Sequence, residues 1–141
     1  MIEKNVENWH LHMKGKLDGG LDELIHDDCV FYSPVVFTPQ KGKELTKMYL
    51  GAAGNTFNTD SDGNPTSTKD SPFKYTKEIL CGDHAVLEFE SEIEGKYING
   101  VDIITWNDEG KIIEFKVMIR PLQAVNMLHQ KMQAMLESMK K

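Results

Sequence analysis

The stretch from Gly100 to Arg120, GVDIITWNDEGKIIEFKVMIR, decides the fold that the sequence predicts. It reads as two strands rich in β-branched and aromatic residues, separated by the polar turn at residues 107–110. Gly110 can adopt the positive φ that such a turn needs near its end. We therefore predict an antiparallel hairpin, and we expect the rest of the chain to enclose one of its faces.

This turn sets a trial register for the hairpin. If Trp106 pairs with Lys111, then Asp102 pairs with Phe115, and each strand alternates between two faces. The inner face then carries Asp102, Ile104, Ile113, Phe115, Val117 and Ile119. A carboxylate among apolar side chains must find hydrogen-bond donors or keep its proton with a raised pKa. Asp102 is therefore the first candidate site residue, although a one-residue slip would move it to the other face.

The outer face of the same hairpin is mixed but has a large apolar content. It carries Val101, Ile103, Thr105, Ile112, Glu114, Lys116, Met118 and Arg120. An apolar area of this size is rarely left bare on a soluble protein. We therefore expect a homodimer that forms through the outer face of the sheet.

Length and composition limit the class of protein. The chain has 141 residues, which suits a single domain over 1–141 with a sizeable core. Its net charge of −6 and the lack of a Lys/Arg cluster argue against nucleic acid and membrane as partners. The N-terminal segment has no apolar signal-peptide core and no membrane span. We expect a cytoplasmic protein in which Cys29 and Cys81 are reduced and buried.

Apolar residues at helical spacing predict an amphipathic first helix centred on Trp9. A second short helix is expected over residues 21–25, closed by the polar residues 26–28. Residues 29–32 then read as a strand. Ser33-Pro34 ends it, because proline has no N–H to donate to a sheet.

The sequence also predicts a third helix, a long loop after it and a helix at the C-terminus. A third helix is predicted between Gly42 and Gly54. Residues 54–72 are rich in Gly, Asn, Asp, Ser, Thr and Pro, which is typical of a long surface loop, either a lid or an insertion. An apolar, methionine-rich stripe over 121–141 predicts a C-terminal helix that packs in the core, over a cavity mouth or against a second subunit.

Residues 73–80 and 84–93 form a second predicted hairpin. Inward Leu87 and Phe89 alternate with outward glutamates, as in a half-buried strand. No histidine or aspartate converges on these glutamates, so we expect no metal site. The order of elements predicts an α+β fold, with a strongly curved antiparallel or mixed sheet wrapping the N-terminal helices and an extra C-terminal helix.

Three stretches together resemble the nuclear transport factor 2-like superfamily, above all its SnoaL-like polyketide cyclase and ketosteroid isomerase branches. They are LDGGLDELIHDDCVFYSP at 17–34, the Gly42-Lys43 opening of the third helix, and GVDIITWNDEGKIIEF at 100–115. The resemblance covers about residues 1–120. It implies a cone-shaped α+β barrel with a deep, mostly apolar pocket and no cofactor, often in a dimer formed through the outer face of the sheet.

The resemblance also implies roles for particular residues. Asp102 takes the place of an aspartic acid that, in the isomerase branch, stays protonated and donates a hydrogen bond to a developing enolate. Trp9 lies near that branch's tyrosine donor on the first helix, and Tyr49 near another pocket tyrosine. The branch's general base is an Asp directly before a Pro, where this chain has Ser33, which cannot take up a proton as a carboxylate does. Val117 occupies the place of the water-activating aspartate of limonene epoxide hydrolases.

Three classes of function remain open. The first is a binding protein whose apolar pocket holds a small carbonyl- or hydroxyl-bearing molecule, oriented by Asp102 and Trp9. The second is a cofactor-independent isomerase, cyclase or hydrolase that uses Asp102 as acid or base. The third is a structural or partner-binding module whose pocket is filled by side chains. The candidate site residues are Trp9, Ser33, Tyr49, Leu87, Phe89, Asp102, Ile104, Phe115, Val117 and Ile119.

Two further expectations separate these classes. An enzyme should place a second titratable group within about 5 to 6 Å of Asp102, whereas a binding protein has no such need. His10, His12 and His84 are expected to face solvent, and so to lie outside the pocket.

Overall fold

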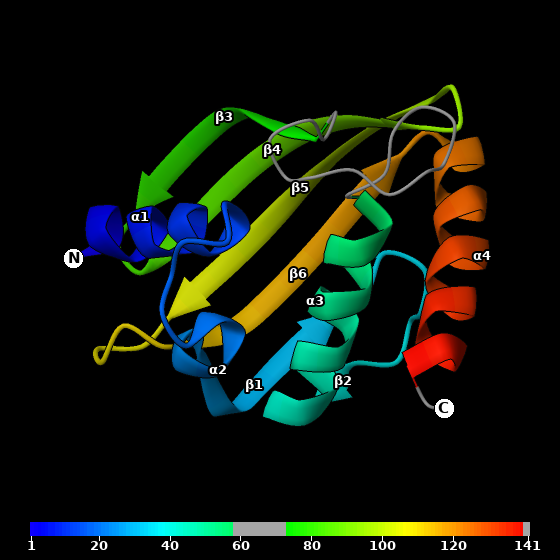
Figure 1. Ribbon diagram of the computed structural model, residues 1–141. Coiled ribbons are helices and arrows are strands. Elements are labelled where there is room, and N and C mark those ends of the chain that lie inside the picture. The colour runs from blue at the N-terminus through cyan, green and yellow to red at the C-terminus, as the bar shows by residue number, and fades with distance from the viewer. Residues whose placement is uncertain (58–72, 140–141) are drawn as a thin grey trace.

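The computed structural model describes residues 1–57 and 73–139. Within these ranges the sheet has six strands in the order β2-β1-β6-β5-β4-β3, and it is mixed because β1 runs parallel to β6. The predicted α+β class, with its curved sheet and C-terminal helix, is confirmed (Figure 1). The elements are α1 (Ile2–Met13), α2 (Gly20–Leu24), β1 (Ile25–Tyr32), β2 (Gln40–Lys41), α3 (Lys43–Phe57), β3 (Lys74–Cys81), β4 (His84–Ile93), β5 (Lys96–Trp106), β6 (Ile112–Arg120) and α4 (Leu122–Met139).

The helices lie against one face of this sheet (Figure 1). Helix α1 covers the end of the sheet near β3 and β4, while α3 lies over β1, with α4 beside it. Val6 and Trp9 of α1 pack into the main core with Leu87, Ile104 and Phe115 of the sheet. A second core joins β4 and β5 to α4. The sheet therefore has a covered inner face, which positions the site, and an outer face on which none of the described helices lies.

The β5–β6 hairpin has the predicted turn but a different register. Asp102 pairs with Val117 and not with Phe115. Because the displacement is even, Asp102 keeps the predicted inner face, together with Ile104.

A β-bulge between Thr105 and Trp106 then changes the alternation next to the turn. Ile112 is fully buried, while Ile113 is only partly buried. The predicted faces of these two isoleucines are therefore wrong, because a hairpin register counted from the turn cannot anticipate an inserted residue.

Strand β1 begins earlier than predicted. It includes Ile25 and the polar residues 26–28, which the sequence assigned to a helix and its end. The pairing of β1 with β6 is irregular between Ile25 and Val30, and Asp27 and Asp28 are exposed there. A strand segment that lacks a regular neighbour can carry polar residues without burying them.

Helix α3 runs past Gly54 to Phe57, so the predicted end at Gly54 is wrong. The Thr56 hydroxyl donates to the carbonyl of Ala52, and the Phe57 ring packs on Phe89. These contacts offset the weak helix propensity of glycine. The predicted surface loop therefore starts later, and its residues 58–72 lie outside the described residues.

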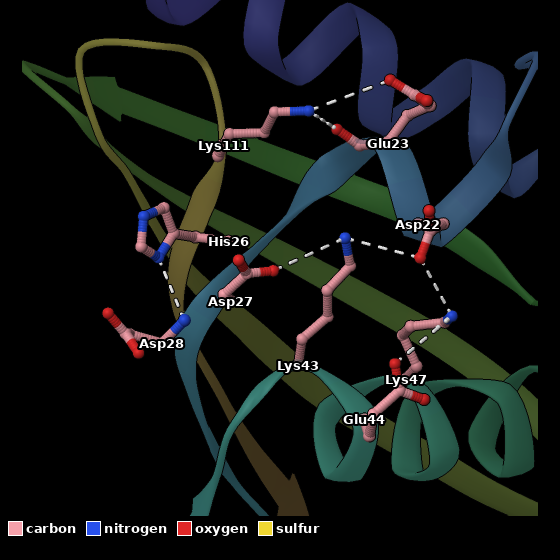
Figure 2. Close-up of polar contacts among 9 residues, drawn as sticks. All are labelled: Asp22, Glu23, His26, Asp27, Asp28, Lys43, Glu44, Lys47 and Lys111. Carbon is pink, nitrogen blue, oxygen red and sulfur yellow. Dashed lines mark hydrogen bonds and ion pairs between the residues drawn. The ribbon is translucent and has the colours of Figure 1, made fainter.

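Lysine side chains of α3 and of the β5–β6 connection contact the acidic side chains of α2 (Figure 2). Nζ of Lys43 and Nζ of Lys47 lie 3.4 and 3.1 Å from Oδ1 of Asp22, and their hydrogen bonds lower the pKa of Asp22. Nζ of Lys111 lies 3.9 Å from Oε2 of Glu23, which joins α2 to the β5–β6 turn. Exposed ion pairs stabilise only weakly, so these contacts set the position of α2 more than the stability of the fold.

Both cysteines are free thiols, but only Cys29 is buried. The prediction that Cys81 is buried is wrong, because it lies at the exposed end of the edge strand β3. Among the described helices, none combines the length and apolar character needed to cross a membrane.

Candidate functional site

A cavity of about 560 Å³ lies between the inner face of the sheet and the helices. A volume of this size falls in the range of small-molecule sites. The wall comes from α1, α3, α4 and the sheet, and is mostly apolar. Its aromatic members are Trp9, Phe31, Phe57, Phe73, Tyr75, Phe89 and Phe115.

One end of the cavity is formed by a cluster of aromatic rings. The rings of Phe73 and Phe89 stack with centroids 4.9 Å apart, and Phe57 meets Phe89 edge-on at 5.7 Å. Phe89 can lie flat on the sheet because its cross-strand neighbour is Gly100. A Cβ on Gly100 would lie 2.5 Å from Cζ of Phe89, so the absence of a side chain sets the depth of the cavity.

Three polar side chains form a hydrogen-bonded chain beside this cluster, where the ring of Tyr75 meets that of Phe73 edge-on at 5.1 Å. The indole Nε1 of Trp9 donates to the hydroxyl oxygen of Tyr75 at 2.9 Å. The Tyr75 hydroxyl donates to Oδ2 of Asp102 at 2.6 Å. Because an indole N–H can only donate, the Tyr75 oxygen accepts from Trp9 and its own proton is available for Asp102. Oδ1 of Asp102 receives no hydrogen bond from any described residue, so it can form a further hydrogen bond.

Burial controls the charge of this carboxyl group. Asp102 is 6% exposed, and burial raises its pKa to about 7, although the Tyr75 hydrogen bond acts in the opposite direction. Near neutral pH both forms are therefore accessible. The neutral form can donate a hydrogen bond, and the ionised form can accept one. Burial and the nearby Asp102 raise the pKa of Tyr75 well above its ordinary value, so Tyr75 keeps its proton.

Two histidines of α1 line the cavity, so the prediction that they face solvent is wrong. The ring of His10 pairs with Glu78 and meets the edge of Tyr75 at 5.4 Å. The ring of His12 packs 5.2 Å from that of Trp9, and burial lowers the pKa of His12. Helix α1 ends earlier than its apolar stripe suggested, which brings its last turn to the cavity edge.

The candidate residues divide between the cavity wall and the layers behind it. Leu87 and Ile104 are fully buried in the core under α1. Tyr49 stacks on Phe31 at 5.5 Å, and Ser33 accepts hydrogen bonds from the backbone N–H groups of the turn that follows it. The candidates that line the cavity are Trp9, Phe89, Asp102, Phe115, Val117 and Ile119.

Tyr75 is the important site residue that the sequence reasoning missed. Phe73 and Tyr75 are spaced for one face of a strand, and that strand pairs with the one that carries Phe89. This alternation was a usable signal for an inward tyrosine. The resemblance instead directed attention to a donor on the first helix, where Trp9 stands.

No group of three or more His, Cys, Asp or Glu side chains within the described part of the chain is placed to hold a metal ion.

No protein-family model and no curated protein matches the chain. Solved structures do. A steroid delta-isomerase from Pseudomonas aeruginosa is 28% identical with a TM-score of 0.82, and the match covers 97% of this chain and 92% of that one. An uncharacterised cystatin-like protein from Silicibacter pomeroyi is 26% identical with a TM-score of 0.75, over 92% and 83% of the two chains.

A further match is an NTF2-like protein of unknown function from Mesorhizobium loti. It is 19% identical with a TM-score of 0.63, over 85% of this chain and 93% of that one. The curved sheet, the helices on its inner face and the extent of these matches define an NTF2-like fold. The chain therefore shares the fold of nuclear transport factor 2-like proteins.

Proposed function

We propose that this chain binds a small, mostly apolar molecule that carries a carbonyl or hydroxyl group. The observation that carries the proposal is Oδ1 of Asp102, a polar atom without a hydrogen-bond partner among the described residues, in a wall of aromatic and aliphatic side chains. A few polar groups in an otherwise apolar cavity are typical of small-molecule sites.

The aromatic wall and Asp102 contribute differently to binding in this proposal. Burial of about 200 Å² of apolar ligand surface contributes roughly 5 kcal/mol, whereas one neutral hydrogen bond contributes about 1 kcal/mol. The aromatic wall therefore supplies most of the affinity. Asp102 supplies orientation, because Tyr75 and Trp9 hold its carboxyl group in one position.

A titration with 2-naphthol and naphthalene tests the proposal. We expect the wild-type protein to bind 2-naphthol more tightly than naphthalene, and Asp102→Leu to bind both with similar affinity. Val117→Leu, which enlarges an apolar side chain of the same wall, should keep the preference for the hydroxyl. If neither compound binds the wild-type protein, the proposal fails, and a cavity filled by side chains is favoured instead.

A second candidate is a cofactor-independent isomerase. It is favoured by the 28% identity with a steroid delta-isomerase and by a buried carboxyl group with a pKa of about 7, which can exchange a proton near neutral pH. The second titratable group that an enzyme should place close to Asp102 is Tyr75. Turnover of a panel of β,γ-unsaturated ketones that is lost in Asp102→Asn would support this candidate, and equal or absent turnover in both proteins would count against it.

We also propose a homodimer through the outer face of the sheet. Met118 is 53% exposed there, beside the partly buried Val101 and Ile103. Burial of this apolar face against a second copy is favourable. Sedimentation velocity should show a dimer at micromolar concentration, and Met118→Lys should shift it toward monomer. A wild-type monomer would contradict the proposal.

A further inference from the structure

His12 lies one helical turn after Trp9, and its side chain lines the same cavity as Asp102. The two rings pack with centroids 5.2 Å apart. Trp9 is itself fixed by its hydrogen bond to Tyr75 and by its contact with Phe115. His12 therefore rests against a wall that is held in place.

The imidazole of His12 has no hydrogen-bond partner among the described residues. Its Nδ1 lies toward Gly20, since a Cβ on Gly20 would be 3.9 Å from this atom. Burial lowers the pKa of His12, which favours the neutral ring with one donor nitrogen and one acceptor nitrogen. A polar ring in a mostly apolar wall is stabilised when a ligand supplies the missing hydrogen bond.

The other titratable groups of the wall are either engaged or exposed. His10 is paired with Glu78, and Tyr75 is engaged by Trp9 and Asp102. Lys14 and Lys74 line the cavity but are exposed residues. Besides Asp102, His12 is therefore the titratable side chain of this wall that is at least partly buried and that has a polar atom without a hydrogen-bond partner among the described residues.

We propose that His12 is the second polar position of the ligand site and accepts a hydrogen bond from a ligand hydroxyl. This inference rests on the proposed function and narrows its ligand class. The ligand has an apolar body with two separated oxygen groups, one carbonyl or hydroxyl at Asp102 and one hydroxyl at His12.

The test compares 2-naphthol with 1,5-, 2,6- and 2,7-dihydroxynaphthalene, which add a second hydroxyl at different separations. At least one diol should bind the wild-type protein about three- to tenfold more tightly than 2-naphthol, the gain of one neutral hydrogen bond. His12→Phe should abolish this gain, so that the diol and 2-naphthol bind this variant with similar affinity. His12→Gln, whose amide oxygen can accept a hydrogen bond, should restore part of it. His129→Phe is the matched control, because His129 is exposed on α4 and does not line the cavity.

A second measurement needs no variant. In the wild-type protein, NMR should show that the tightest diol lowers the pH at which His12 becomes protonated, because a bound hydroxyl stabilises the neutral ring, while 2-naphthol does not. This readout keeps the inference testable if His12→Phe fails to fold.

The outcomes separate the two proposals. If no naphthol binds the wild-type protein, the proposed function is overturned, and this inference falls with it. If 2-naphthol binds but no diol gains affinity, or if the gain persists in His12→Phe, the inference alone is overturned.

Discussion

The Tyr75 hydroxyl oxygen lies 2.6 Å from Oδ2 of Asp102, and this hydrogen bond joins β3 to β5 across the intervening strand β4. A separation this short is typical of a hydroxyl that donates to a carboxyl group. The hydrogen bond from Trp9 to the Tyr75 hydroxyl connects this pair to α1. The polar group of the cavity is thus held by three elements that are distant in the sequence, so its geometry depends on the complete fold.

Replacing Asp102 by Asn should change the pH dependence of stability. The folded-state pKa of about 7 is raised above the ordinary value of 3.8. The folded state therefore holds a proton that the unfolded state has lost between these values, and stability falls as the pH rises through this window, by at most about 1.4 kcal/mol per pH unit. Urea unfolding should show that wild-type stability relative to Asp102→Asn falls between pH 5 and pH 7. A difference that is constant over this range contradicts the raised pKa.

Removing the Tyr75 hydroxyl should raise the pKa of Asp102 further. The Tyr75 hydrogen bond is the interaction that opposes the effect of burial, and Tyr75→Phe deletes it while leaving Nε1 of Trp9 unpaired. We expect a loss of about 1 to 3 kcal/mol in the free energy of unfolding. Carboxyl ¹³C NMR measures the pKa of Asp102 in the wild-type protein and in Tyr75→Phe.

The control for this variant is Tyr97→Phe. Tyr97 is exposed and its hydroxyl donates to Glu90, so its removal should change stability by less than about 0.5 kcal/mol. Equal effects of the two variants would show that the buried hydrogen bonds among Trp9, Tyr75 and Asp102 have no special role in stability.

A side chain at Gly100 should damage both the fold and the cavity. The Cβ of Gly100→Ala would lie 2.5 Å from Cζ of Phe89 and 2.7 Å from the carbonyl oxygen of Met118. Overpacking of this kind costs about 1 to 3 kcal/mol, and displacement of the Phe89 ring into the cavity should weaken binding of 2-naphthol. Gly54→Ala is the opposite case, because its Cβ meets no atom within 4 Å and lies in a helix. It should be neutral or stabilising, and similar losses in both variants would argue against the clash.

The two thiols should react at very different rates. Cys81 is exposed, whereas Cys29 is 0% exposed and burial raises its pKa to about 11. Because the thiolate is the reactive form, a disulfide reagent at pH 8 should label one thiol in the native protein and the second only after unfolding. Cys81→Ser should abolish the fast reaction. Fast labelling of both thiols would contradict the buried position of Cys29.

The sequence predicted the parts of the fold that follow from local patterns. The turn at residues 107–110 and the alternation of β4 were sufficient to predict the hairpins and to put Asp102 on the inner face. The register of β5–β6 and the faces of Ile112 and Ile113 were wrong, because Trp106 pairs with Ile112 and not with Lys111, and because a bulge at Thr105 and Trp106 depends on how the sheet bends. Local pattern carries no information about that bend.

The candidate site shows a similar limit. Asp102 stood out because it interrupts an apolar row, but its partner Tyr75 lies on a strand whose pattern alone does not identify a partner. Leu87 and Ile104 share the inner face with Asp102, yet α1 covers them. Which inner residues line a cavity depends on where the helices end, as the last turn of α1 shows for His12.

The most direct test of the account is the affinity for 2-acetylnaphthalene as a function of pH. Its ketone can only accept a hydrogen bond, so it should bind the form with a protonated Asp102 more tightly than the ionised form, by about the contribution of one hydrogen bond. We predict that wild-type affinity falls by about tenfold between pH 6 and pH 9, with a midpoint near the pKa of about 7, while Asp102→Asn, whose amide donates at every pH, shows no such fall. Affinity that is independent of pH in the wild-type protein, or that falls equally in Asp102→Asn, would contradict the claim that Asp102 meets the ligand.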